Sequence, residues 1–327
     1  MASYKEIHGT NIQVVASDPS NPIDGQVWYN STSKALKGFK DVPASWATGG
    51  NMNSARSQLG GAGTQTAALG FGGYLSTGPT DITESYNGSS WTEVGDLNTA
   101  RRLAAGGGTQ TAALIAGGHN PPPTADTETW NGSSWTEVAN LNTGRRQLAG
   151  DGSTTSFLAF GGEPPQTEKT ESWNGSGWTE VADLNTRRSN HGAAGASNTS
   201  SLCFGGVKFN PGGDPPSGGA HNESWNGSSW TELADLNSPR YGTTGTGTAT
   251  AALAMGGTQD PPVVAITETW NGTAWTETAD LSTARSFHGP AGTNTLALAF
   301  GGGAPSRTVA TEEFTGGGPA TVSFSTD

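Results

Sequence analysis

Residues 111–118 read TAALIAGG and residues 127–138 read TETWNGSSWTEV, and these two segments indicate how the rest of the chain is built. The apolar run before the Gly-Gly pair is too short for a helix and is bounded by glycine, so it predicts a strand buried on both faces. The second segment alternates on either side of Asn131-Gly132. Because Asn-Gly between two alternating runs is a strong hairpin signal, this segment predicts two strands joined by a type I′ turn.

The same arrangement recurs along the chain at intervals of 44, 45 or 51 residues. Each repeat contains an Arg, a Gly-rich stretch, an apolar run ending in Gly-Gly, a variable loop and the alternating segment. With one strand after the Arg, every repeat predicts four antiparallel strands, which is typical of a blade of a β-propeller. The first glycines of the six pairs are Gly72, Gly117, Gly161, Gly205, Gly256 and Gly301.

The order of Arg, Gly-Gly, an aromatic residue and Trp resembles the kelch repeat over roughly residues 44–316. The first and last repeats depart from the pattern, with Tyr86 and Phe314 where the others have Trp. The resemblance implies an all-β fold, a six-bladed kelch-like β-propeller with four antiparallel strands per blade. It implies no activity, because one fold hosts many functions.

The outer-strand tryptophans predict how the ring closes. The first of them, Trp46, has no repeat before it, and the last repeat has no such Trp after it. We therefore expect the segment around Trp46 to supply the outer strand of the last blade. In the alternative closure a strand in the tail, residues 317–327, takes that place. The six residues are Trp46, Trp91, Trp135, Trp178, Trp230 and Trp275.

The composition excludes several classes of protein. The chain has 327 residues, a formal net charge of −12 and 13% charged residues, so the basic surface that drives nucleic-acid binding is missing. The single cysteine, Cys203, permits neither an intrachain disulfide nor a cysteine metal cluster. No stretch has the apolar length of a membrane helix, and residues 1–25 lack the pattern of a signal peptide. We expect a soluble protein made in a cytoplasm.

Residues 1–43 lie outside the repeats and predict a small hairpin module, with strands at 26–29 and 35–39. The module resembles segments of bacteriophage virion appendage and tail-fibre proteins. This resemblance implies location in a virion assembled in the host cytoplasm, and docking of the module to other virion proteins. The resemblance is carried by Gly25, Gln26, Trp28, Tyr29, Asn30, Ser31, Thr32, Leu36, Lys37 and Gly38, and the expected docking residues are Trp28, Tyr29, Asn30, Leu36 and Phe39.

One Arg and one Glu recur in register in every repeat. A ring of six Arg could bind an anionic sugar or a carboxylate, but the matching Glu residues favour structural pairing within each blade. The arginines are Arg56, Arg101, Arg145, Arg187, Arg240 and Arg285, and the glutamates are Glu84, Glu128, Glu171, Glu223, Glu268 and Glu312.

The remaining candidates for ligand contact lie on the face that carries the variable loops, where binding usually occurs on a rigid scaffold. A second Arg in three repeats has no repeated acidic counterpart, and the loop at residues 207–222 is the longest. The candidates are Arg102, Arg146, Arg188, His119, Lys208, Phe209, Asp214 and His221.

No arrangement of residues predicts catalysis. The five histidines lie at non-equivalent positions without metal-ligand spacing, and no nucleophile has a base in a recognisable pattern. We expect neither cofactor nor metal. The leading hypothesis is a non-enzymatic virion structural protein whose loops recognise a bacterial surface glycan or protein. The alternatives are a capsid decoration protein that binds only virion subunits and a carbohydrate-active propeller enzyme, and a homo-oligomer is compatible with each.

Overall fold

The structure, a computed structural model, describes residues 12–208, 218–259, 261–303 and 306–324, and in these ranges it contains strands but no helix. Contacts divide the chain into a small unit, Met1–Ala44 with Gly316–Asp327, and a large unit, Ser45–Thr315. The large unit consists of four-stranded antiparallel sheets and short two-stranded ones. Its architecture is all-β and propeller-like, as the repeats predict.

In the large unit, the first two strands of each four-stranded sheet are the Gly-rich stretch and the apolar run of one repeat. In the apolar runs the last four residues are buried, as expected of strands covered on both faces. The first strands are β5 (Gly60–Thr64), β11 (Ala105–Thr109), β15 (Ala149–Ser153), β20 (Gly192–Ser197), β25 (Thr244–Thr248) and β29 (Gly289–Gly292). The second strands are β6 (Ala67–Phe71), β12 (Ala112–Ala116), β16 (Ser156–Phe160), β21 (Ser200–Phe204), β26 (Ala251–Met255) and β30 (Leu296–Phe300).

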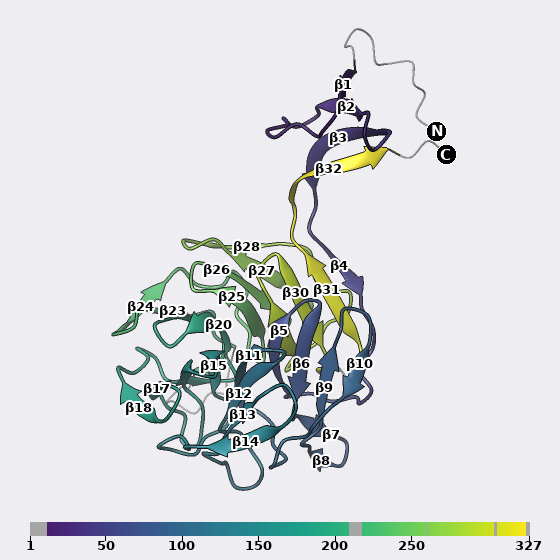
Figure 1. Cartoon of the computed structure of the whole chain (residues 1–327). Helices are drawn as coiled ribbons and strands as arrows, with labels where there is room; N and C mark the ends of the chain where they lie inside the picture. The colour runs from purple at the N-terminus through teal and green to yellow at the C-terminus, as the bar shows by residue number, and fades with distance from the viewer. Residues whose placement is uncertain (1–11, 209–217, 260, 304–305, 325–327) are drawn as a thin grey trace. The chain divides into compact units, whose positions relative to one another are not determined.

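The third and fourth strands are the alternating segments. The third strands are β9 (Thr83–Tyr86), β13 (Thr127–Trp130), β17 (Thr170–Trp173), β23 (Asn222–Trp225), β27 (Thr267–Trp270) and β31 (Thr311–Thr315). The fourth strands are β10 (Trp91–Glu93), β14 (Trp135–Val138), β18 (Trp178–Val181), β24 (Trp230–Leu233), β28 (Trp275–Glu277) and β4 (Ser45–Thr48). Figure 1 shows the first strands around a common centre and the fourth strands at the periphery.

The hairpins between third and fourth strands are as predicted, but their turn type is not. Trp130 pairs with Trp135, so the loop has the four residues Asn-Gly-Ser-Ser, and only its glycine, Gly132, has a left-handed φ (95°). Asn131 does not take a positive φ. Its side-chain oxygen instead accepts hydrogen bonds from the N–H groups of Ser133 (2.9 Å) and Ser134 (3.0 Å). The type I′ prediction is therefore wrong.

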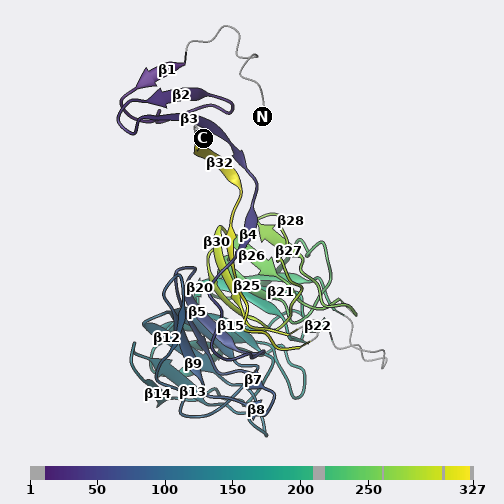
Figure 2. The same ribbon diagram turned by 90° about the vertical axis from the view of Figure 1, so that its right-hand side faces the viewer.

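The strand around Trp46 pairs where the sequence predicts. In β4, Trp46 lies opposite Phe314 of β31 in an antiparallel ladder, and their rings are 5.1 Å apart. The tail strand β32 (Gly318–Phe324) pairs instead with β3 (Ala35–Val42) in the small unit, and the two lie side by side in both views (Figures 1 and 2). The alternative closure by the tail is therefore wrong.

Tryptophans of the fourth strands connect successive sheets. Trp135 packs edge-on against Phe71 of the preceding sheet, with ring centroids 5.1 Å apart, and its Nε1–H donates to the hydroxyl of Thr83 at 3.0 Å. The same bond joins Trp178 to Thr127 at 3.1 Å. Burying these large rings between sheets stabilises the stack, while the hydrogen bond satisfies the one polar atom.

A ring of backbone hydrogen bonds joins the loops before the first strands. The N–H of Leu103 donates to the carbonyl of Gln58 at 3.0 Å, and each further loop bonds to its predecessor until the N–H of Gln58 reaches the carbonyl of Phe287 at 2.7 Å. Each member has a left-handed φ between 53° and 62°. The six residues are Gln58, Leu103, Gln147, Asn190, Gly242 and Phe287.

The small unit is a four-stranded sheet in the order β1-β2-β3-β32, in which β1 (Gln13–Val15) runs parallel to β2 (Val27–Asn30). The antiparallel pair β2-β3 is the hairpin expected at residues 26–39, displaced by one residue at β2 and extended at β3. Trp28 is its fully buried aromatic residue. A hydrogen bond from Trp28 Nε1 to Asp18 Oδ1 at 3.0 Å anchors it.

Candidate functional site

The recurring Arg and Glu form buried ion pairs in the large unit, which confirms the structural interpretation for five of the six predicted pairs. Arg56 Nη1 lies 3.2 Å from Glu84 Oε1, and both side chains are fully buried. Glu128 pairs with Arg101 and also accepts hydrogen bonds from the backbone N–H and side-chain amide of Asn98, at 2.8 and 2.7 Å. Each carboxylate thus holds the loop that connects its sheet to the previous one. These arginines are not available to a ligand.

The fourth repeat uses Arg188, not Arg187, for this pair. Arg188 is buried and donates to Glu223 and to the carbonyl of His221 at 2.9 Å. The assignment of Arg188 to a ligand-binding face is therefore wrong, and so is that of Arg187 to the repeated position. Alignment on the buried leucine would have found this, because Arg188 follows Leu184 by four residues as Arg101 follows Leu97.

In several repeats an isolated antiparallel β-bridge joins two positions. One is the residue after the buried Arg, and the other is the residue after Gly-Gly. Arg102 is paired in this way with His119, Arg146 with Glu163, and Ser57 with Tyr74. The remaining pairs carry other residues at these places. In the fourth repeat, β19 (Arg188–Ser189) pairs with β22 (Val207–Lys208). Short pairings also occur in the loops, such as β7 (Tyr74–Leu75) with β8 (Gly78–Pro79).

Two cations lie over the ring of Tyr74. The guanidinium carbon of Arg102 lies 4.0 Å from the centroid of the Tyr74 ring, and that of Arg307 lies 4.5 Å from it. Arg102 Nη1 donates to Gln58 Oε1 at 2.8 Å. Burial lowers the pKa of Arg102, while the charges of Arg146 and Arg307 also lower it. We call Arg102, Arg146, Arg307, His119 and Tyr74 the cation cluster.

Arg146 extends the cation cluster towards the next repeat. Its guanidinium lies 3.0 Å from Glu163 Oε1 and 3.0 Å from His119 Nε2. Burial lowers the pKa of His119, and the charges of Arg146 and Arg102 add to this effect. His119 is therefore held neutral, and its Nε2 accepts a hydrogen bond from Arg146. The structure brings together three of the predicted ligand residues, Arg102, Arg146 and His119.

Sequence reasoning missed Gln58, Tyr74 and Arg307 as members or neighbours of this cluster. Tyr74 had a usable signal, because it follows Gly73 as His119 follows Gly118. Arg307 had none, since it lies in a loop of variable sequence whose position depends on the fold. Its backbone is bridged to Gly303.

The other predicted ligand residues lie elsewhere. The backbone of Lys208, in β22, pairs with that of Arg188 in β19. Phe209 and Asp214 lie outside the described residues. His221 Nδ1 lies 3.5 Å from Glu232 Oε1 and 3.9 Å from Asp235 Oδ2. Such a group could hold a cation, but its two carboxylates are exposed, and exposed acidic groups are common without one.

Two of the five expected docking residues are part of the small unit's own structure. Trp28 and Asn30 are buried, and both donate to Asp18 Oδ1, Asn30 at 2.7 Å. Hydrogen bonds from Lys37, then from Asn30 and Trp28, lower the pKa of Asp18 to about 2. The assignment of Trp28 and Asn30 to a docking surface is therefore wrong. Tyr29, Leu36 and Phe39 are partly exposed.

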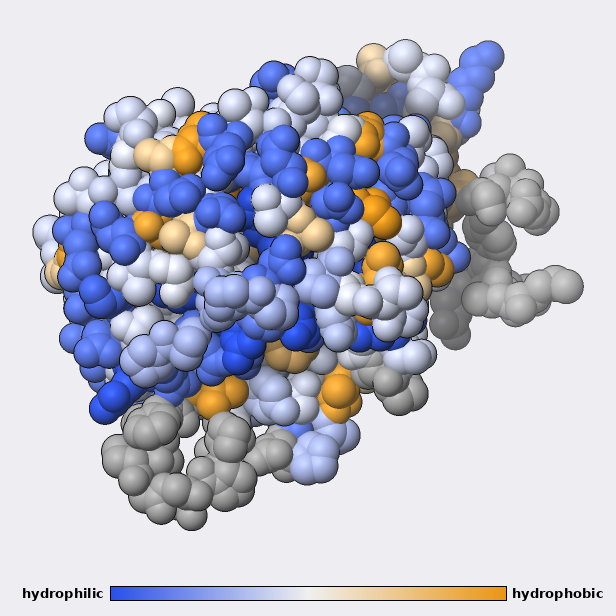
Figure 3. Space-filling model, turned by 90° about the horizontal axis from the view of Figure 1, so that it is seen from below, coloured by the Kyte–Doolittle hydropathy of each residue, from blue (hydrophilic) through white to orange (hydrophobic). Residues whose placement is uncertain are grey.

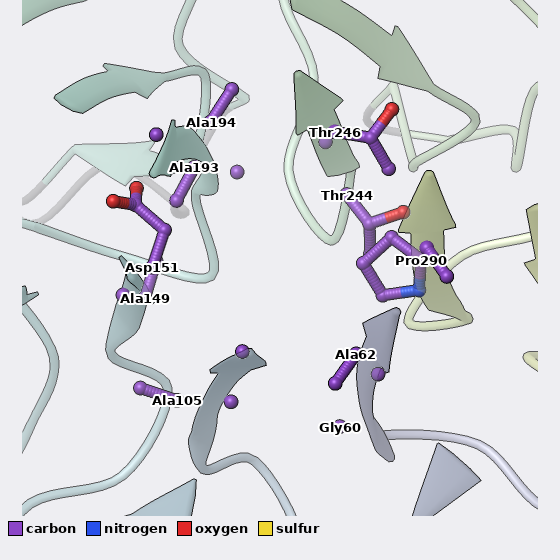
Figure 4. Close-up of a pocket in the computed structure, with 18 of the residues that line it drawn as sticks. Gly60, Ala62, Ala105, Ala149, Asp151, Ala193, Ala194, Thr244, Thr246 and Pro290 are labelled. Atoms are coloured by element: carbon purple, nitrogen blue, oxygen red, sulfur yellow. The ribbon is translucent and has the colours of Figure 1, made fainter. Parts of the chain in front are cut away.

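A cavity of about 570 Å³ lies among the first strands of the sheets (Figure 4). More than half of its lining residues are glycine and alanine, including Ala62, Ala105 and Ala149, and most of the others are polar but uncharged. Its one carboxylate, Asp151, is buried and accepts a hydrogen bond from Ser201 at 2.6 Å. Burial raises the pKa of Asp151 to about 8, against the effect of that bond.

Other titratable groups of the large unit are buried in structural positions. Burial and the charge of Arg188 lower the pKa of His191 to about 3, and burial and the charge of Arg285 lower that of His288 to about 3. Burial raises the pKa of the Cys203 thiol to about 12. A thiol in this state is a weak nucleophile.

Comparisons with models of known protein families and with curated proteins found no match to this chain. Across the described ranges, no helix is long and apolar enough to span a membrane. The face seen in Figure 3 is largely hydrophilic, with hydrophobic residues dispersed over it.

Proposed function

We propose that the chain is a non-enzymatic structural protein of a bacteriophage virion, in a tail fibre, appendage or particle surface. In this proposal the large unit is a six-bladed, kelch-like β-propeller whose loops recognise a component of the host surface. The small unit binds other virion proteins. The virion assignment rests on the resemblance of residues 25–38 to virion appendage proteins.

Ring closure with six blades is supported by two independent features. The six loops of the hydrogen-bond ring return to their starting residue, because Gln58 bonds to Phe287. The first strands also contact one another in sequence order, and β29 contacts β5. A ring closed in this way leaves no uncovered sheet face between its first and last blades and gives a rigid support for loops.

The observation that carries the recognition role is the contrast between repeated and non-repeated side chains at the loops. Buried Arg–Glu pairs recur in every repeat, whereas the neighbouring positions differ, with Arg102 and His119 in one repeat and Ser286 and Gly303 in another. If these loop positions served only to stabilise the fold, we would expect the same residue at each of them in every repeat. Different side chains on equivalent rigid positions suit binding.

A docking role of the small unit is supported by its exposed apolar side chains. The exposed fractions of Val14 and Ile23 are 67% and 71%, and that of Phe324 is 44%. Val14, Tyr29, Leu36 and Phe324 are successive partners across the four strands, so they lie on one face of the sheet. Such a row on a small sheet suits contact with another protein.

The test is binding of the labelled full chain to a panel of bacterial cells and to purified virion components. We expect selective, saturable binding to cells of some strains. A chain that binds virion components but no cell of any strain would contradict the recognition role and favour the particle-building alternative. Shortening of a host polysaccharide during incubation would contradict the non-enzymatic assignment.

A further inference from the structure

Three guanidinium groups from three different loops gather in the cation cluster, in a chain whose net charge is −12. We infer that Arg102, Arg307 and Arg146 form a subsite for the anionic group of a surface glycan, a carboxylate, phosphate or sulfate carried by a sugar. The inference rests on the proposed function, which supplies the glycan. The anionic chemistry comes from the cluster itself.

The cation cluster has an excess of positive charge. Arg146 forms an ion pair with Glu163, and the two side chains are 29% and 28% exposed. The guanidinium of Arg102 contacts the neutral side chains of Gln58 and Tyr74. Burial, and then the charges of Arg146 and Arg307, lower the pKa of Arg102, so a bound anion would relieve a repulsion that Arg102 experiences in the free protein.

The arginines are held in place before any ligand arrives. The backbone of Arg102 exchanges hydrogen bonds with that of His119, at 2.8 and 3.3 Å, and its side chain is fixed by Gln58 and by the ring of Tyr74. Arg146 exchanges backbone bonds with Glu163 at 2.8 and 2.9 Å. Preorganised side chains lose less conformational entropy on binding.

The guanidinium group is well suited to the proposed ligand. Its planar set of N–H donors matches carboxylate, phosphate and sulfate oxygens in pairs, which an ammonium group cannot do. A long polyanion is a poorer fit, because the acidic chain around this small basic cluster would repel it. The cluster therefore favours one charged substituent on a saccharide over nucleic acid.

The experiment is titration calorimetry of the full chain with oligosaccharides of one length that carry a carboxylate, a phosphate, a sulfate or no charge. We expect at least one charged probe to bind more tightly than the neutral one, and less tightly as salt is raised. Arg102→Gln and Arg307→Gln should each weaken binding about 10- to 100-fold, as expected for a lost hydrogen bond to a charged group. Arg102→Lys should restore only part of the affinity.

Lys169→Gln is the matched control, because it removes one cation that pairs with Glu180 outside the cation cluster. It should leave affinity unchanged, and near-ultraviolet circular dichroism of every variant should equal that of the parent. Equal binding of charged and neutral probes, no binding of any charged probe, unchanged affinity of both Arg variants, or equally tight binding of a DNA oligonucleotide would each overturn the inference.

Two outcomes separate this inference from the proposed function. Cell binding that survives Arg102→Gln and Arg307→Gln would remove the anionic subsite and leave host recognition standing. Arg-dependent binding of a charged oligosaccharide without binding to any cell would leave the subsite standing and remove host recognition.

Discussion

Arg101 and Arg102 are neighbours in the sequence and have opposite roles in the structure. Arg101 is buried and paired with Glu128, and its counterparts recur in the other repeats. Arg102 is partly exposed over Tyr74, and Arg146 is its only counterpart among the residues that follow the six buried arginines. The position of Arg101 stabilises the packing of the sheets, whereas the residue at the position of Arg102 differs between repeats.

Burial and register therefore decide whether an arginine stabilises the fold or can contact a ligand, and residue type alone does not. A buried guanidinium requires a carboxylate in every repeat, because an unpaired charge in the interior is strongly destabilising. An exposed guanidinium has no such requirement and is free to vary. The predictions below test this division.

The largest effect is expected from breaking a buried pair. Glu128→Gln leaves the Arg101 guanidinium uncompensated in the interior and should lower the free energy of unfolding by about 3–5 kcal/mol. Glu163→Gln, which breaks the partly exposed pair with Arg146, should lower the free energy of unfolding by about 1 kcal/mol or less. Urea unfolding of both variants measures the two values. Equal losses would contradict the division.

A smaller effect is expected from pH, through Asp151. Its folded pKa, about 8, lies above the ordinary aspartate value of 3.8, so the folded state retains a proton that the unfolded state has lost, and stability falls as pH rises towards 8. His191 and His288 act oppositely, since their folded pKa of about 3 lies below 6.5, but their effect ends near pH 6.5.

Between pH 6.5 and 8, Asp151 should therefore lower the free energy of unfolding of the large unit by about 2 kcal/mol, at ~1.4 kcal/mol per pH unit. Asp151→Asn should abolish this decline in urea unfolding at several pH values. A decline that persists in the variant would show that another group titrates. Arg102→Gln serves as the control and should leave the decline in place.

The smallest effect is expected at the cation cluster. Tyr74→Leu removes the ring beneath Arg102 and Arg307 and should lower the free energy of unfolding by about 1 kcal/mol, the usual size of exposed cation–π contacts. Tyr74→Phe retains the ring and should change the free energy of unfolding by less than half of the Tyr74→Leu effect. Thermal unfolding measures both. A loss as large as that of Glu128→Gln would make the cation cluster a structural element.

Much of the fold could be predicted because it follows from repetition. The Gly-Gly pairs, the alternating segments and the position of Trp46 gave the strands, their order and the pairing of β4 with β31. The turn type was missed because the Asn131 side chain competes for the backbone N–H groups, which the Asn-Gly pattern alone does not reveal.

Less of the candidate site could be predicted. Arg102 and Arg146 were found because they have no repeated acidic counterpart, and His119 because it lies in a variable loop. Arg188 was misassigned because two adjacent arginines offered two registers. The approach of Arg307 to Tyr74 joins loops more than 200 residues apart, at a distance set by the fold alone.

The pairing of β4 with β31 also bears on how the protein folds. Trp46 and Phe314 are partners, yet nearly the whole large unit lies between them in the chain. A contact of this separation forms late and slowly, because the long intervening segment must be ordered first. Until then β4 and β31 remain unpaired strand edges, and at high concentration β4 of one molecule can pair with β31 of another. Refolding should therefore give more swapped dimers as protein concentration rises, and Trp46 is the residue whose partner distinguishes the monomer from the exchanged form.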